Sequence, residues 1–135
     1  MVAQGKDVFL KELQESLETG HYREIPVGVV YEDYMKDKVQ TAVPEYSDDH
    51  PSRFYRFGSY RLEVYDGILL TIAVPVQMEV HEQDVAELFG EGDVQSSNNE
   101  HVVSYRSDDC VITFNFRQDS RRLTEVSLTS SMFID

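Results

Sequence analysis

A pattern that occurs twice along the chain constrains the fold more than any single motif does. Each occurrence is a helix-like segment followed by three strand-like runs: 31–43, 53–57, 60–65 and 68–74 in the first, and 81–89, 101–106, 110–116 and 122–128 in the second. Self-similarity at this spacing indicates a supersecondary unit that is used more than once. The sequence therefore predicts internal repeat units at about 29–76 and 80–131.

The predicted elements rest on hydrophobic periodicity. Between Tyr60 and Tyr65 apolar and polar residues alternate, as in a strand with one buried face. Asp66-Gly67 joins this run to the next one and is a strong hairpin signal. Apolar residues at helical spacing predict a further, N-terminal helix at 7–19 that starts at Asp7.

Together these elements predict one α+β domain over residues 1–135. Each unit supplies a helix and a three-stranded antiparallel meander, and the strands form a sheet with helices packed on one face. The pattern does not decide whether the two meanders join edge to edge or pack side by side. Pro44 is expected to end the helix at 31–43, and the polar segment 91–100 is expected to be the least regular part.

Length and composition place the chain among globular domains. With 135 residues and 41% apolar residues, it can bury a core of its own. No apolar run approaches the roughly 20 residues that span a bilayer, and the N-terminus does not resemble a signal peptide. The single cysteine, Cys110, cannot form an internal disulfide. We therefore expect a cytoplasmic protein that does not bind membranes.

Charge is the main indication of a partner. The formal net charge is −13, and no lysine or arginine occurs between Arg61 and Arg106. An acidic field repels nucleic acid and attracts basic proteins. An acidic surface also keeps a protein soluble without any partner, so charge alone leaves both interpretations open.

Catalytic and metal-binding motifs are not found in the sequence. The four histidines are far apart in the chain, there is no cysteine pair, and the glycines are scattered. Cys110 lies in an apolar strand-like run, where a buried thiol is the common case. We expect no catalytic residues, no metal and no cofactor.

The acidic region 79–93, the Asp48-Asp49 loop and the polar sheet face supply the candidate partner-binding residues. Tyrosines on such a face are effective anchors in a protein interface. The candidates are Asp48, Asp49, Glu63, Tyr65, Glu79, Glu82, Asp84, Glu87, Glu91 and Asp93.

The segment 54–64, followed by Asp66-Gly67 and an aliphatic strand, resembles a pattern of small bacterial immunity proteins. The doubled helix-plus-meander plan is similar to the beta-lactamase-inhibitor-like architecture. The resemblance implies an immunity protein that binds and neutralises a basic protein toxin, such as a nuclease. Monomer and homodimer both stay open, because exposed edge strands can pair in a dimer. The alternatives are a non-catalytic adaptor domain or an inhibitor that mimics nucleic acid. A deep pocket in which histidine and carboxylate groups converge would instead favour an enzyme.

Overall fold

The computed structural model describes residues 2–23, 25–36, 43–45, 52–97 and 99–131 of the chain. Within them lie three helices, which are α1 (Val2–Thr19), α2 (Tyr31–Met35) and α3 (Glu82–Phe89). The strands of the first half are β1 (His21–Tyr22), β2 (Ile25–Pro26), β3 (Val29–Val30), β4 (Val43–Glu45), β5 (Ser52–Phe57), β6 (Tyr60–Tyr65) and β7 (Ile68–Pro75). Those of the second half are β8 (Asp93–Ser96), β9 (Glu100–Arg106), β10 (Cys110–Arg117) and β11 (Leu123–Ser130).

One antiparallel sheet dominates the described part of the chain. Its strand order is β4-β5-β6-β7-β11-β10-β9-β8, and β3 pairs with the start of β7. The strands from the two halves of the chain meet where β7 pairs with β11. The two sets therefore join edge to edge, which answers the question that the sequence left open.

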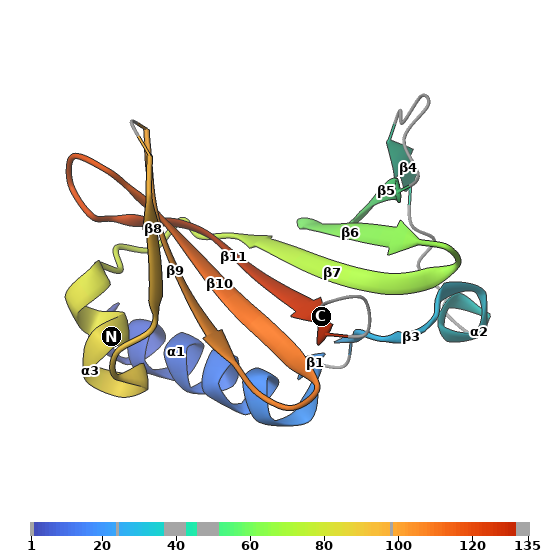
Figure 1. Cartoon of the computed structure of the whole chain (residues 1–135), viewed down its shortest axis with the longest axis horizontal. Helices are drawn as coiled ribbons and strands as arrows, with labels where there is room; N and C mark the ends of the chain where they lie inside the picture. The colour runs from blue at the N-terminus through green and yellow to red at the C-terminus, as the bar shows by residue number, and fades with distance from the viewer. Residues whose placement is uncertain (1, 24, 37–42, 46–51, 98, 132–135) are drawn as a thin grey trace.

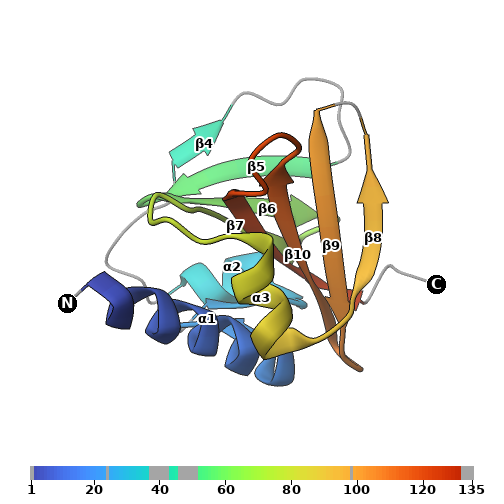
Figure 2. The ribbon, with the colours of Figure 1, turned by 90° about the vertical axis from the view of Figure 1, so that its left-hand side faces the viewer.

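Alternation along the strands defines an inner face that holds the core. Phe114 in β10 lies opposite Val126 in β11, and Val126 lies opposite Val74 in β7. All three side chains are buried. Leu13 of α1 and Val85 of α3 are buried in the same core, and Figures 1 and 2 show both helices on this side of the sheet.

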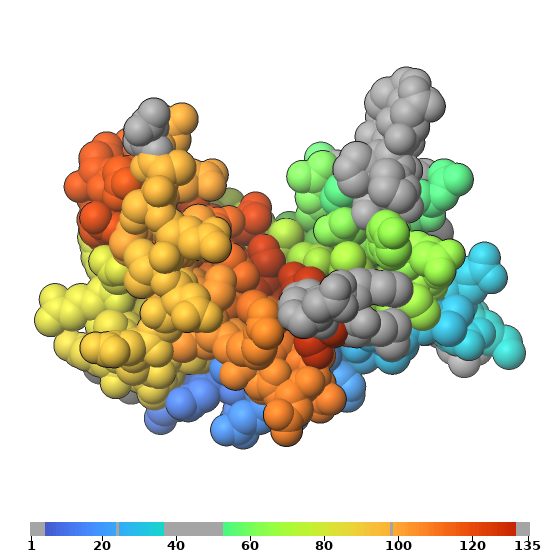
Figure 3. Space-filling model, viewed as in Figure 1, coloured from blue at the N-terminus to red at the C-terminus, as the bar shows by residue number. Residues whose placement is uncertain are grey.

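The other face of the sheet carries mainly polar side chains. One cross-strand row contains Thr113, Ser127, Ala73 and Arg61, in neighbouring strands from β10 to β6. In the space-filling view this side is hollowed between the end formed by β8–β10 and the end formed by β5–β6 (Figure 3). The sheet is thus covered by helices on one side and is concave on the other.

The predicted helix at 31–43 is corrected by the structure. Helix α2 covers only Tyr31–Met35, and Val43–Glu45 form strand β4, which pairs with β5. Pro44 therefore lies in a strand instead of ending a helix. A proline is tolerated there because β4 is the last strand at this end of the described sheet, where one side of the backbone has no ladder partner among the described residues.

Two further expectations about secondary structure are wrong. Segment 91–100, expected to be irregular, contains strand β8, because an edge strand needs few apolar residues. The N-terminal helix begins at Val2 and not at Asp7. The predicted strands themselves agree with β5, β6, β7, β9, β10 and β11 to within two residues.

The thiol of Cys110 is buried, as expected from its strand. Its Sγ donates to the carbonyl of Leu17 at 3.3 Å, which ties β10 to the end of α1. Burial raises the pKa of this thiol, while the Ser107 hydroxyl opposes the shift. None of the helices that the structure describes is long and apolar enough to cross a bilayer.

Two valine substitutions, one in the core and one at the surface, test where the core lies. Val126→Ala should lower the free energy of unfolding by about 2 kcal/mol, because it removes fully buried methyl groups at the join between the halves. Val94→Ala is the matched control and should change it by less than about 0.5 kcal/mol, because that side chain is 55% exposed. Urea unfolding of both variants measures the difference, and equal losses would contradict the described core.

Candidate functional site

A pocket of about 460 Å³ lies between α3 and strands β8 and β9. Apolar side chains make up much of its wall, and two glutamates are among its lining residues. The lining residues are Glu82, Val85, Ala86, Gly90, Glu91, Gly92, Val94, Val103, Tyr105 and Phe116. A concave, mostly apolar site with a few polar groups is the usual form of a binding site.

Helix α3 forms one wall of the pocket because its two ends are fixed. At the start, the His81 backbone N–H donates to the Asp84 carboxylate at 2.9 Å, as in one half of a capping box. At the end, Gly90 adopts a φ of 81° and donates to the Ala86 carbonyl. The Tyr105 hydroxyl donates to the Gly90 carbonyl at 2.8 Å, which joins this helix end to β9. Burial raises the pKa of Tyr105.

A chain of three polar side chains connects α3 with β8 and β9 beside the pocket. The His101 ring lies between Ser96 Oγ, 2.7 Å from its Nδ1, and a carboxylate oxygen of Glu82 at its Nε2. The His101 side chain is only 8% exposed. Arg121 Nη1 lies 4.0 Å from the second Glu82 oxygen. The chain therefore fastens the start of α3 to the β8–β9 hairpin.

A serine, a histidine and a glutamate in this order also resemble the arrangement that activates a serine nucleophile. Acyl transfer further needs N–H donors that stabilise the developing oxyanion. The amide that follows Ser96 cannot serve, because the Ser97 N–H donates to the Glu100 carbonyl at 2.9 Å. The hydrogen bonds of His101 thus hold α3 against the β8–β9 hairpin. The backbone N–H after the serine, which stabilises the oxyanion in many such hydrolases, is already bonded here.

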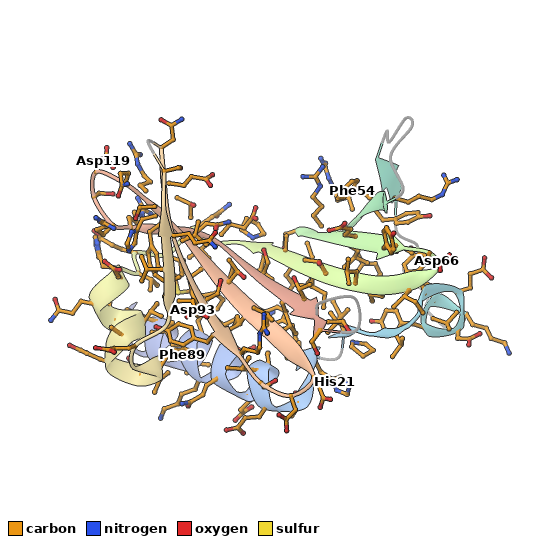
Figure 4. The ribbon with its side chains drawn as sticks, viewed as in Figure 1. His21, Phe54, Asp66, Phe89, Asp93 and Asp119 are labelled. Carbon is orange, nitrogen blue, oxygen red and sulfur yellow. The ribbon has the colours of Figure 1, made fainter. Side chains whose placement is uncertain are left out.

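Acidic side chains gather at the edge of the sheet next to the pocket. Glu18 of α1, Glu91 and Asp93 line one hollow there, together with Phe89 and Arg106. Figure 4 shows Asp93 and Phe89 close together where β8 begins. Among the described residues, none of these three carboxylates lies within 4.0 Å of a Lys or Arg nitrogen. We call Glu18, Glu91 and Asp93 the acidic edge.

The predicted partner-binding acids do not form one surface. Glu82 and Asp84 make contacts inside the protein, since Glu82 bonds His101 and Asp84 pairs with Lys6 at 3.1 Å. Glu87 lines a separate hollow between α3 and α1, and Glu79 is an exposed residue that lies 3.3 Å from His81. Only Glu91 and Asp93 of these lie in the acidic edge.

The remaining candidates lie elsewhere. Glu63 and Tyr65 are on β6, on the concave face, where Glu63 lies opposite Thr71. They are separated from α3 by the sheet itself (Figure 1). Asp48 and Asp49 lie outside the described residues.

Ser96, His101 and Glu18 were not predicted as members of a site. Their sequence neighbours carry no motif. Ser96 meets His101 through the pairing of β8 with β9, and Glu18 lies beside Asp93 because both line the same hollow. In the described ranges, no group of three His, Cys, Asp or Glu side chains has an arrangement that could hold a metal ion.

Comparison with known proteins identifies the fold alone. No protein-family model and no curated protein matches the sequence. A DUF4309 family protein (YjgB) from Bacillus subtilis subsp. subtilis str. 168 is similar in structure, with a TM-score of 0.67, 14% identity, and coverage of 90% of this chain and 95% of that chain. An extracellular protein containing a SCP domain from Bacillus anthracis str. Ames has a TM-score of 0.50 at 12% identity, over 76% of this chain and 43% of its own. Neither is described as an immunity protein.

The Lys6–Asp84 pair predicts a pH dependence of stability. Partial burial opposes ionisation of Asp84, but the His81 N–H and the Lys6 ammonium outweigh it and lower the pKa below its usual 3.8. Because its pKa is lower in the folded than in the unfolded state, the ionised Asp84 carboxylate stabilises the folded protein above pH 3.8. This contribution to the free energy of unfolding is lost as the pH falls through the folded-state pKa.

Asp84→Asn should therefore destabilise the protein at pH 7, and its deficit relative to the wild type should shrink steadily below pH 3.8. Urea unfolding between pH 7 and pH 2.5 measures the difference, because this range includes the usual carboxylate pKa of roughly 4. Asp93→Asn is the control, because Asp93 has no ion-pair partner among the described residues. A deficit of Asp84→Asn that stays constant over this range would contradict a lowered pKa of Asp84 in the folded protein.

Proposed function

We propose that this chain is a non-catalytic protein-binding domain that holds a cationic protein partner at the acidic edge. The observation that carries the proposal is that Glu18, Glu91 and Asp93 line one hollow, which Arg106 also lines. Among the described residues, no Lys or Arg nitrogen lies within 4.0 Å of these three carboxylates. Carboxylates that are not balanced from within attract cations from outside. The apolar pocket next to them supplies the hydrophobic part that a stable interface needs.

The partner that we propose is a basic bacterial toxin, which this chain would neutralise as an immunity protein. Support comes from the resemblance of segment 54–64 to immunity proteins and from the net charge of −13. Acidic inhibitors associate quickly with basic partners because long-range attraction raises the association rate. A cytoplasmic location, where such an inhibitor protects its own cell, belongs to the same proposal.

We further propose that the sheet consists of two copies of one helix-plus-meander unit. The last strand of each half lies at the centre, where β7 pairs with β11, and the short strands β4 and β8 lie at the two ends. The residues before each helix also correspond. Val30 before α2 pairs with Ile68, and His81 before α3 forms a bridge with Arg122.

A second candidate function is hydrolysis at Ser96, which the hydrogen bonds of His101 to Ser96 and Glu82 favour. A fluorophosphonate probe forms a covalent bond with an activated serine and thus distinguishes the two functions. We expect no labelling of Ser96, because the Ser97 N–H is already bonded. Labelling that is lost in Ser96→Ala and in His101→Gln would contradict a non-catalytic domain.

Neutralising the acidic edge tests the proposed function. The edge variant carries Glu18→Gln, Glu91→Gln and Asp93→Asn, and the control variant carries Glu32→Gln, Asp66→Asn and Asp108→Asn at exposed positions elsewhere. Both variants lose the same formal charge. Affinity capture from the native lysate, with mass spectrometry, identifies the partner of the wild type.

The association rate of that partner should fall at least tenfold for the edge variant and less than threefold for the control, since local charge dominates steering. It should also fall as salt is raised from roughly 50 to 500 mM, which shortens the Debye length to about 4 Å. A partner that is acidic, or one that binds both variants equally, would rule out the acidic edge as the binding surface.

A further inference from the structure

Strand β8 ends the sheet and presents its outer side to solvent. In the described part of the chain its pairing partner is β9 alone, and all four of its residues are exposed. The ladder between β8 and β9 runs from Asp93 opposite Ser104 to Ser96 opposite His101 without a bulge. The strand contains no proline and no lysine, the residues that commonly prevent edge strands from pairing.

The hydrogen-bonding pattern shows which backbone groups of β8 face outward. The Ser97 N–H donates to the Glu100 carbonyl, so Ser97 and Glu100 form a hydrogen-bonded pair. Such pairs alternate along an antiparallel ladder with pairs that are not hydrogen-bonded to each other. The N–H and C=O groups of Val94 and Ser96 therefore point away from β9 and are positioned to receive another strand.

The apolar pocket lies beside this edge on the inner face of the sheet. Val94 lies opposite Val103, and both line the pocket. Val103 is 4% exposed, whereas Val94 is 55% exposed. A strand added to β8 would place every second side chain on this inner face. One apolar side chain of that strand would then cover Val94 and enter the pocket.

The negative charge beside β8 favours a basic partner strand. Asp93 begins β8, and Glu91 and Glu18 lie next to it. A second copy of this chain would bring a further net charge of −13 and the same carboxylates to the edge. A segment with Lys or Arg at alternating positions would instead place its cations near these acids and its apolar residues on the pocket.

We propose that β8 accepts an extended basic segment of a partner protein as an additional strand, with one apolar side chain of that segment in the pocket between α3 and β9. This inference rests on the proposed function, because it describes how the cationic partner is held. The added strand spans about four residues, or about 13 Å at the rise of an antiparallel strand.

The probe is a synthetic peptide of alternating Lys and Val residues, compared with one of alternating Glu and Val residues. The basic peptide should slow hydrogen exchange at the Val94 and Ser96 amides, and the acidic peptide should not. Val94→Pro removes one outward N–H without removing a bond to β9, and should weaken peptide binding at least tenfold. Val94→Thr keeps that N–H but replaces one methyl group of the pocket wall with a hydroxyl. It should therefore weaken peptide binding clearly less than Val94→Pro does.

Several outcomes would overturn the inference. These are no binding of the basic peptide at millimolar concentration, equal binding of both peptides, equal binding by Val94→Pro, or protection at amides outside β8. Dimerisation of the wild type that Val94→Pro abolishes would assign the edge to a second copy instead. If the captured partner binds Val94→Pro normally but fails to bind the edge variant, the proposed function stands and strand addition is wrong.

Discussion

The pairing of β7 with β11 is the interaction on which the rest of the structure depends. It aligns the inner-face side chains of both halves, so that Val74, Val126 and Phe114 form one cross-strand row. Only a continuous inner face gives α1 and α3 a common surface to cover. The positions of α3, the pocket and the acidic edge all follow from this join, because each lies where the helices meet the β8–β9 end of the sheet.

The candidate site arises from incomplete coverage of that inner face. Helix α3 is held by His101 through Glu82 and by Tyr105 through the Gly90 carbonyl. It covers Val103 but leaves Val94 exposed. An exposed apolar residue on an edge strand offers a surface that another strand can cover, and the carboxylates beside it have no Lys or Arg partner among the described residues. A partner that supplies a strand, an apolar side chain and positive charge would satisfy all three features at once.

The sequence predicted the long strands well and the short elements poorly. Strands β6, β10 and much of β11 alternate between buried and more exposed residues, and β7 is a mostly apolar run. Strand β8 has a single apolar residue, and β4 contains a proline, so neither has a periodic signal. The same limit applies to the site. The clustering of Glu91 and Asp93 could be expected from the cation-free stretch, whereas Glu18, Ser96 and His101 join the site only through tertiary structure.

The central claim is that the acidic edge carries a negative potential that is available to an external cation. It can be measured without a known partner, from the relaxation of backbone amide protons by cationic and by anionic nitroxide molecules. The account predicts that the cationic probe is strongly enriched over the anionic one at Glu91 and Asp93. The enrichment should be clearly smaller at Ser127 and Ala73, which lie in the same cross-strand row as Asp93 but on β11 and β7. Equal enrichment at both places, or none at Glu91 and Asp93, would contradict it.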